Sequence, residues 1–382
     1  MSHAPSQALE TRHQTVRAFL AEQGLDALVV TALPNILYLT NFTGSSAIVV
    51  LTTTSLHFIT DFRYVAAISE TRGTAIECPG LDLVTVESAY DTTLANVLTG
   101  LGRARVGFEA AHLSVSRHQW LVKTLTNGPA LLATEGIVER ARVRKDSYEL
   151  DTLREAARRL SSVANVVFDD VRPGKTERDV AMSIDWRIRE AGFERSAFET
   201  IVAAGANAAL PHAKPGERKL VEGDLVVLDF GGVYDSYCVD LTRTVVLGRA
   251  SDRARKVYQA VLEAHDRAVA AVKPGVTRFD IDGAARQSLI AAGFGEAFGH
   301  GTGHGLGIEV HEEPRISRRR PGVDRAEADP SADDQVAPGM VFTIEPGAYF
   351  PGWSGVRIED DVLVTESGVE MLTHVPTDLM EL

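Results

Sequence analysis

The sequence predicts a chain of two domains: an α/β domain over residues 1–140, followed by an α+β domain over residues 141–382 that consists of two repeated halves. Three observations carry this prediction. Strand-like apolar segments alternate with helical ones in the first third, a charged stretch (140–145) precedes a long helical segment (148–171), and the remainder contains an internal repeat. A length of 382 residues is ample for two domains of ordinary size.

The apolar spacing of the first third predicts a helix and several strands. Val16, Phe19 and Leu20 share one face of a helix expected over residues 13–24. Short apolar runs predict buried strands. These runs cover residues 28–30, 47–51, 56–59, 107–109 and 135–138. The first domain is therefore expected to contain a mixed sheet flanked by helices.

An internal repeat organises the second domain. Val-Arg-Pro-Gly-Lys-Thr (171–176) is matched by Val-Lys-Pro-Gly-Val-Thr (272–277), and Ala-Gly-Phe (191–193) recurs at 292–294, so that both matches are offset by 101 residues. Thr176 precedes Asp179, and Thr277 precedes Asp280, at the spacing of a capping box at a helix start. A Pro-Gly joint before a helix also occurs without duplication, but two matches at one offset favour duplicated halves.

Each copy of the repeat is followed by two strand-like segments that carry acids. In the first copy the run 225–229 ends at Asp229, and the run 239–244 contains Asp240. In the second, the run 341–345 ends at Glu345, and the run 356–360 contains Glu359. A pseudo-twofold arrangement would bring the four carboxylates together at its centre, where they could not all stay ionised without cations.

Taken singly, most of these acids have a simpler interpretation. Asp229 stands before Gly231 and Gly232, which is typical of a turn. Asp240 and Glu359 are compatible with solvated strand faces or surface ion pairs. Glu345 follows an apolar run directly, and a carboxylate in a buried strand requires a partner.

Three histidines lie between the second copy of the repeat and Glu345, the first acid that follows it. The run Gly-His-Gly-Thr-Gly-His-Gly-Leu-Gly (299–307) contains His300 and His304, and His311 follows in His-Glu-Glu-Pro. Glycine lets backbone approach a site closely, and histidine is both the commonest metal ligand and a proton carrier near neutral pH. The spacings of a phosphate loop, a dinucleotide fingerprint and a His-Glu-x-x-His zinc site do not occur in the sequence.

The histidines and the four acids together favour a metal site. A carboxylate-rich set with one imidazole suits Mn²⁺, Fe²⁺ or Co²⁺ better than a thiolate zinc site. Four carboxylate charges balance two divalent ions, and such a pair is suited to metal-assisted hydrolysis. Cys78 and Cys238 are the only cysteines, and we expect both to be small core residues.

Composition excludes several classes of partner. The formal net charge is −13, the wrong sign for binding nucleic acid or an anionic membrane surface. The sequence contains neither a run of about eighteen apolar residues nor a basic-then-apolar leader pattern at the N-terminus. We therefore expect a cytoplasmic protein whose partner is a small molecule or a peptide.

The spacing of these residues resembles a known family. Asp229 and Asp240 lie eleven residues apart, His304 stands in His-Gly-Thr-Gly-His-Gly, Glu345 in Thr-Ile-Glu-Pro-Gly, and Glu359 in Gly-Val-Arg-Ile-Glu-Asp. This set resembles the five ligands of the dinuclear pita-bread metallopeptidases. The N-terminal domain is similar to the creatinase/prolidase type, which places the resemblance with the Xaa-Pro group: Xaa-Pro dipeptidase (prolidase) and aminopeptidase P.

The resemblance implies roles for ten residues. It implies two divalent metal ions, Mn²⁺ first and Co²⁺, Fe²⁺ or Zn²⁺ as alternatives, held by Asp229, Asp240, His304, Glu345 and Glu359. It further implies that Glu345 carries a proton in catalysis.

The other five residues would act on the substrate. His212 and His311 match histidines on the substrate or proton-transfer side, and Arg357 matches an arginine beside the last glutamate. His300 matches an outer histidine of aminopeptidase P-like members. Arg315 resembles an arginine that binds the free carboxylate of a dipeptide, so we expect both residues to contact substrate. Without the resemblance, His212 would be interpreted as an exposed loop residue.

The implied activity is hydrolysis of Xaa-Pro bonds in dipeptides or longer peptides by a homodimer. Creatinase-like C–N hydrolases, sulfonium lyases and metal-free binding relatives share the fold and remain alternatives. A methionine aminopeptidase would share the ligands but is disfavoured by the large N-terminal domain. The stretch 317–337 is longer than we expect for this connection, and it is interpreted as a surface loop or as a lid or partner contact near the site.

Overall fold

The computed structural model describes residues 3–320 and 334–382 and divides into two compact units, residues 1–142 and 143–382. The sequence placed the domain boundary between residues 140 and 141. The central part of the long connection noted above (321–333) lies outside the described residues. Among the helices of the described ranges, none has the length and apolar character needed to cross a membrane.

The first unit is a six-stranded mixed sheet with helices. Its strands are β1 (Ala27–Val30), β2 (Ile48–Thr52), β3 (Leu56–Thr60), β4 (Leu81–Thr85), β5 (Arg105–Glu109) and β6 (Ala130–Thr134), in the order β4-β3-β2-β1-β5-β6. The β1-β2 and β2-β3 pairs are antiparallel, and the other pairs are parallel. Its helices are α1 (Ser6–Glu22), α2 (Leu33–Thr40), α3 (Phe62–Glu70), α4 (Tyr90–Gly100), α5 (Val115–Thr124) and α6 (Ile137–Arg142).

The strand expected over residues 135–138 is wrong. Strand β6 ends at Thr134, and the chain then turns at Gly136, whose φ is +67°. Ile137 and Val138 are buried, but in the first turn of α6 rather than in the sheet. A short apolar run does not by itself distinguish a strand from one turn of a buried helix.

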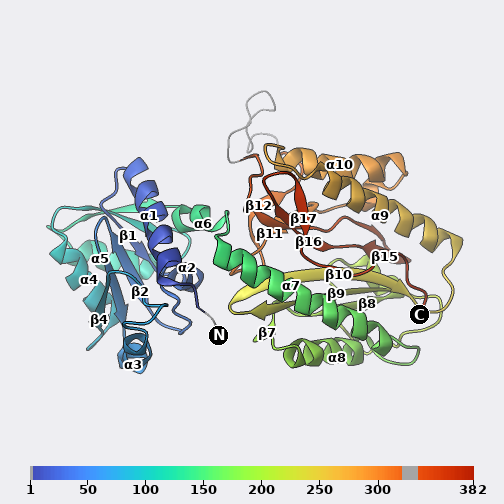
Figure 1. The fold of residues 1–382 in the computed structure, drawn as a ribbon, viewed down its shortest axis with the longest axis horizontal. Coiled ribbons are helices and arrows are strands. Elements are labelled where there is room, and N and C mark those ends of the chain that lie inside the picture. The colour runs from blue at the N-terminus through green and yellow to red at the C-terminus, as the bar shows by residue number, and fades with distance from the viewer. Residues whose placement is uncertain (1–2, 321–333) are drawn as a thin grey trace. The chain divides into compact units, whose positions relative to one another are not determined.

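The second unit contains two pairs of helices and the strands between them (Figure 1). The first half comprises α7 (Ser147–Val167), α8 (Glu177–Glu190), β7 (Arg195–Ser196), β8 (Ile201–Ala204), β9 (Leu225–Tyr234) and β10 (Tyr237–Val246). The second comprises α9 (Asp252–Ala271), α10 (Arg278–Ala291), β11 (Gly303–Gly305), β12 (Glu312–Ile316), β13 (Val341–Ile344), β14 (Gly347–Phe350), β15 (Ser354–Arg357), β16 (Asp360–Val364) and β17 (Val369–Met371).

The strands of each half form their own sheet. The first sheet has the order β10-β9-β7, with β8 also paired to β9, and the second has the order β12-β11-β13-β16-β17; β14 and β15 pair as a separate hairpin. Apolar side chains of α9, α10 and the second sheet form one continuous core, which includes Val257, Val261, Leu289, Phe342 and Val362. In Figure 1 the strands of the two halves lie between the helix pair α7 and α8 and the helix pair α9 and α10.

The helix starts follow the capping chemistry that the repeat predicted. Thr176 accepts a hydrogen bond from the Asp179 amide (3.0 Å), and the Asp179 carboxylate accepts one from the Thr176 amide (2.9 Å), which completes a capping box. In the second copy the Thr277 hydroxyl also accepts from the Asp280 amide (3.1 Å). There, however, the Asp280 carboxylate accepts from the Thr277 hydroxyl (2.7 Å).

Candidate metal centre and active site

A long regular hairpin positions the two acids of the first half. β9 and β10 pair antiparallel over ten residues each, and in this register Asp240 stands opposite Gly231 while Thr242 stands opposite Asp229. Both aspartates are buried. The turn interpretation of Asp229 is therefore excluded, because β9 continues through the two glycines that follow it.

Short strands position the ligand candidates of the second half. His304 lies on β11, Glu345 follows β13 directly, and Glu359 lies between β15 and β16. The sequence had treated residues 356–360 as one strand, but the ladder breaks at residues 358 and 359. A methyl group at Gly303 would overlap the carbonyl oxygen of Thr343, so glycine is what allows β11 to approach β13 this closely.

The two halves meet at a seam between β10 and the segment around Glu359. The Glu359 amide donates to the Thr242 carbonyl (3.1 Å), and the Thr242 hydroxyl donates to Glu359 Oε2 (2.6 Å). The Asp240 amide donates to Asp361 Oδ2 (3.0 Å). Asp240 and Glu359, which are far apart in sequence, are thereby fixed side by side.

The residues at this seam fit a cation. One ligand atom from each of Asp240, His304 and Glu359 lies within 4.8 Å of the others. Within the described residues, Asp229 Oδ1 and Asp240 Oδ1 are buried without a hydrogen-bond partner. Buried, unpartnered carboxylate oxygens are costly unless a cation or a proton meets them.

Electrostatics in the metal-free protein support the same interpretation. Burial raises the pKa of Asp240 well above its ordinary value, and the charges of Glu359 and Asp229 raise it further. The pKa of Glu359 is raised in the same way, by burial and then by Glu345 and Asp229. Burial raises the pKa of Glu345 to about 7. A centre of this kind becomes fully ionised only when positive charge is added.

His304 is oriented as a neutral ligand. Burial and the neighbouring His311 lower the pKa of His304 to about 3, so its 3.6 Å contact with Glu345 Oε1 is not an ion pair at neutral pH. His304 Nδ1 lies 3.1 Å from the carbonyl oxygen of Gly305. A hydrogen on Nδ1 leaves the lone pair of Nε2 for a metal ion.

A chain of hydrogen bonds connects Arg357 with His300. Arg357 donates to Asp229 Oδ2 (2.5 Å) and to the Tyr349 hydroxyl oxygen (2.8 Å). That hydroxyl lies 3.0 Å from His300 Nε2, and His300 Nδ1 lies 2.7 Å from the Gly301 carbonyl oxygen. Both nitrogens of His300 therefore have partners within the protein, and burial lowers its pKa to about 4.

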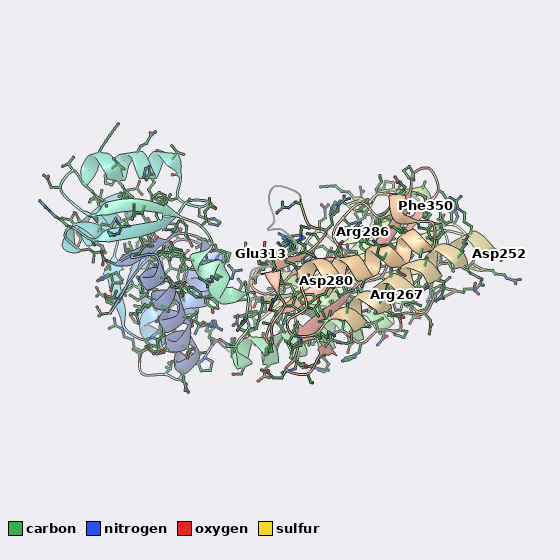
Figure 2. The ribbon with its side chains drawn as sticks, turned by 90° about the horizontal axis from the view of Figure 1, so that it is seen from above. Asp252, Arg267, Asp280, Arg286, Glu313 and Phe350 are labelled. Carbon is green, nitrogen blue, oxygen red and sulfur yellow. The ribbon has the colours of Figure 1, made fainter. Side chains whose placement is uncertain are left out.

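A salt bridge on α10 holds the glycine-rich loop. Asp282 pairs with Arg286 (2.9 Å) and accepts from both the amide and the hydroxyl of Thr302 (3.1 and 2.9 Å). Arg286 also donates to the His300 carbonyl (2.8 Å). Figure 2 shows Arg286 on α10, on the same helix as Asp280 near its start. This helix therefore fixes the loop that carries His300 and leads to His304.

One cavity of about 480 Å³ brings the candidate ligands and the candidate substrate-side residues together. Every residue that the sequence predicted for the site lines it: His212, Asp229, Asp240, His300, His304, His311, Arg315, Glu345, Arg357 and Glu359. The rings of His304 and His311 lie with centroids 4.3 Å apart. Phe198, Ile201, Pro211 and Val310 add apolar wall. The cavity thus offers cation ligands, imidazoles and two arginines, Arg315 and Arg357, beside an apolar surface.

Sequence reasoning missed Tyr349, Asp361 and Asp282, and it placed Thr242 on the face of Asp240 without giving it a role. Tyr349 and Asp361 lie within or beside motifs that were noticed, but their hydrogen bonds to Arg357 and to the Asp240 amide depend on the tertiary fold. Thr242 alternates with Asp240 along β10, which was a signal that the two share a face. Asp282 carried no signal, because an acid on a helix is ordinary.

Comparisons with known proteins place the chain in a recognised group. The model of metallopeptidase family M24 matches residues 151–366, and the model of the creatinase/prolidase N-terminal domain matches residues 12–144. An uncharacterized peptidase of Bacillus subtilis is 35% identical over 367 residues, which cover 96% of this chain and 99% of the relative.

Solved structures are similar over almost the whole chain. A Xaa-Pro dipeptidase from Bacillus anthracis superposes with a TM-score of 0.90 at 35% identity, covering 98% of this chain and 100% of its own. An X-Pro aminopeptidase from Thermotoga maritima superposes with a TM-score of 0.84 at 31% identity, covering 97% of this chain and 99% of its own. The pita-bread fold with a creatinase/prolidase-type N-terminal domain is confirmed.

Proposed function

Because the chain belongs to metallopeptidase family M24, we propose that it hydrolyses Xaa-Pro peptide bonds with two divalent metal ions and releases the N-terminal residue. The family and the relatives support peptidase activity. Their names include both a dipeptidase and an aminopeptidase, so substrate length is left to experiment. The homodimer and the cytoplasmic location stay predictions.

The observation that carries the proposal is the buried cluster of acids around His304. Asp229, Asp240, Glu345 and Glu359 line one cavity, and two of their oxygens are buried without a partner among the described residues. We propose these five residues as the ligands, with Mn²⁺ as the expected metal and Co²⁺, Fe²⁺ or Zn²⁺ as alternatives, because the oxygen-rich set suits such ions. When bound, two such ions polarise a carbonyl and make water a stronger acid.

The other predicted residues, together with Glu345, would act on the substrate or orient a ligand. Glu345, which directly follows β13 and lines the cavity, would take a proton from water and pass it to the leaving nitrogen. His212 and His311 would hold the tetrahedral oxyanion and the proline side. Arg315 would bind a free carboxylate. Arg357 would orient Asp229 through their hydrogen bond.

Proline explains why a dedicated site is needed. The nitrogen of an Xaa-Pro bond carries no hydrogen, and the ring fixes φ of the residue that follows the bond. A peptidase that recognises extended backbone by hydrogen bonds therefore loses one donor at this bond. A cavity that binds the chain end by charged groups avoids that requirement.

The test is turnover of a Xaa-Pro dipeptide beside a Xaa-Pro-Yaa tripeptide, by chelated protein and after addition of Mn²⁺, Co²⁺ or Zn²⁺. Metal-dependent cleavage of the dipeptide alone would define a dipeptidase and support Arg315 as the carboxylate anchor. Preference for the tripeptide would define an aminopeptidase. No cleavage of either peptide by metal-loaded protein would overturn the proposal in favour of a lyase, another C–N hydrolase or a binding protein.

Glu345→Gln tests the proton-carrying role separately. This substitution keeps the size of the side chain and one oxygen but removes the ability to carry a proton at neutral pH. We expect kcat to fall at least about a hundredfold. Unchanged kcat would overturn the assignment of Glu345, and bound metal measured on the same sample would tell a lost ligand from a lost proton carrier.

A further inference from the structure

The turn that carries His311 is shaped by its neighbour Glu312. We propose that Lys145 and Glu312 form a buried ion pair that positions this turn (305–312), and that Lys145 is thereby a positioning residue of the active site. The inference rests on the proposed function only in assigning His311 to the substrate side. Lys145 comes from the charged stretch at the domain boundary, and Glu312 from the His-Glu-Glu-Pro motif, neither of which the proposed mechanism uses.

The Glu312 carboxylate accepts a backbone hydrogen bond from inside the turn. Its Oε1 accepts a hydrogen bond from the Glu309 amide (3.0 Å), and the Gly307 amide donates to the Glu309 carbonyl (3.0 Å). A methyl group on Gly307 would lie 2.8 Å from Glu312 Oε2, so the absence of a side chain there makes room for the carboxylate. Val310 and His311, which line the cavity, lie between these contacts.

Lys145 supplies the positive charge that this buried carboxylate requires. Its Nζ lies 3.2 Å from Glu312 Oε2, and the two side chains are only 1% and 7% exposed. The Lys145 amide donates to the Gly339 carbonyl (2.8 Å), which fixes the backbone of Lys145 beside the start of β13. A buried carboxylate that loses its cation either takes up a proton or moves toward water.

Movement would be felt between the two ends of the turn. One end is held because the Cys238 amide donates to the Gly307 carbonyl (2.6 Å) and the Cys238 thiol lies 3.5 Å from the Ile308 carbonyl oxygen. The other end is held by the backbone of Glu312, which pairs with Gly305 in the β11–β12 ladder. Loss of the ion pair would therefore displace the segment between these ends, which carries His311. A displacement of about 1 Å in a substrate-positioning group can cost on the order of a hundredfold in rate.

Three variants separate positioning from general stability. Lys145→Met removes the ammonium group that lies beside Glu312 Oε2. Lys145→Met with Glu312→Gln removes both charges and keeps an amide oxygen that can accept from the Glu309 amide. Arg154→Met is the control for loss of an ion pair away from the cavity, because it breaks the more exposed Arg154–Glu370 pair (2.8 Å) between α7 and β17.

The first measurement is kcat and KM of metal-loaded protein on a Xaa-Pro peptide. We expect Lys145→Met to lower kcat about tenfold to a hundredfold, the double variant to recover most of that loss, and Arg154→Met to change little. In a His311→Ala background, Lys145→Met should cost almost nothing more. Equal losses with and without His311 would show that Lys145 does not act through His311.

The second measurement does not depend on activity. Histidine ring signals of ¹⁵N-histidine-labelled, chelated protein report the environment of His311, with the assignment made by His311→Asn. Lys145→Met should shift the His311 signals and leave those of the buried His13 unchanged. A folded Lys145→Met protein with unmoved His311 signals would overturn the inference, even if the wild-type protein cleaved no peptide at all.

Discussion

The two halves of the second unit share the same backbone arrangement before their first acid and differ in the length of the segment that precedes it. In the first half the amide of Gly174 donates to the carbonyl of Leu220, and in the second the amide of Gly275 donates to that of Val336, both at 2.9 Å. Asp229 lies nine positions after Leu220, and Glu345 lies nine positions after Val336. The first acid of each half is thus held in the same way.

The difference lies between the glycine and its partner. Gly174 and Leu220 are 46 residues apart, whereas Gly275 and Val336 are 61 apart, so the second half contains fifteen more residues at this place. This interval carries His300, His304 and His311, as well as the long connection, whereas the corresponding interval of the first half carries His212. The comparison teaches that the repeated backbone positions an acid in each half. The extra residues of the second half lie in the interval that carries three of the site histidines.

The largest expected effect tests whether both halves are needed for the metal centre. Asp240→Asn and Glu359→Gln should each lower activity at least about a hundredfold and lower the amount of bound metal, because each removes a ligand charge from the seam. Metal content and kcat on a Xaa-Pro peptide check this.

The same two variants should be more stable than the wild type after chelation. Each replaces a buried acid, which in the metal-free protein must either take up a proton or carry its charge beside the other acids, by a neutral amide, so thermal unfolding should occur at a higher temperature. If either Asp240→Asn or Glu359→Gln kept full metal content and activity, the half that carries that residue would not be needed for the metal centre.

The next effect concerns stability and tests the close approach of β11 to β13 at Gly303. Gly303→Ala would push a methyl group into the Thr343 carbonyl and should destabilise the protein by about 3 kcal/mol, at the upper end for overpacking. Gly283→Ala on α10 is the control, because nothing lies within 4 Å of the added methyl group and alanine favours helix by about 1 kcal/mol. Urea unfolding of both variants compares them, and equal stabilities would contradict the close approach.

The pH dependence of stability follows from the raised pKa values of the acids. The pKa of Glu345 is about 7 in the folded, metal-free protein against about 4.5 unfolded, so its contribution is full below pH 4.5 and is lost as pH rises through 7. His300 and His304 act oppositely, since their lowered pKa values cost stability only as pH falls below about 6.5. Above about pH 6.5 these two histidines no longer change stability with pH, whereas the acids, together with the buried His265, whose pKa is raised, lose stability as pH rises.

The melting temperature of chelated protein should therefore fall between pH 6.5 and 8.5. Adding Mn²⁺ should remove the fall, because the ions favour the ionised acids. Scanning calorimetry at several pH values checks both expectations. Chelated Glu359→Gln should show a shallower fall, and a flat profile for the wild type would speak against the repulsion among these acids.

The smallest expected effect is one that should be equal in the two halves. Gly174 and Gly275 follow the two matched prolines with φ of +90° and +84°, and neither has an atom within 4 Å of an added methyl group. Alanine at either site should cost roughly 1–2 kcal/mol through backbone strain alone. Unfolding free energies that differ by more than this would show that the two turns are less alike than their backbones suggest.

The sequence revealed the parts of the fold that depend on local chemistry. The offset of 101 residues predicted the duplication, and the threonine caps at Thr176 and Thr277 lie at the helix starts. The run before Glu345 indicated a buried carboxylate. All ten predicted site residues line one cavity, although their individual roles stay predictions.

What the sequence could not reveal depends on contacts between distant segments. Lys145 was interpreted only as part of a charged boundary, because its pairing with Glu312 spans 167 residues. Asp361 was one acid among several until the fold placed it on the Asp240 amide. The run 135–138 was assigned to a strand because four residues carry too little periodicity to distinguish a helix from a strand.

The seam between β10 and Glu359 has a consequence for how the molecule comes to be folded. Thr242 and Glu359 are joined by a backbone and a side-chain hydrogen bond across 117 residues of chain. Contacts of such long range require the closure of a long loop, whose entropic cost precedes any stabilisation, so we expect them to form late. Tight capture of a divalent ion during refolding would then report the arrival of the final native contacts, and we expect it to lag behind the recovery of helical circular dichroism.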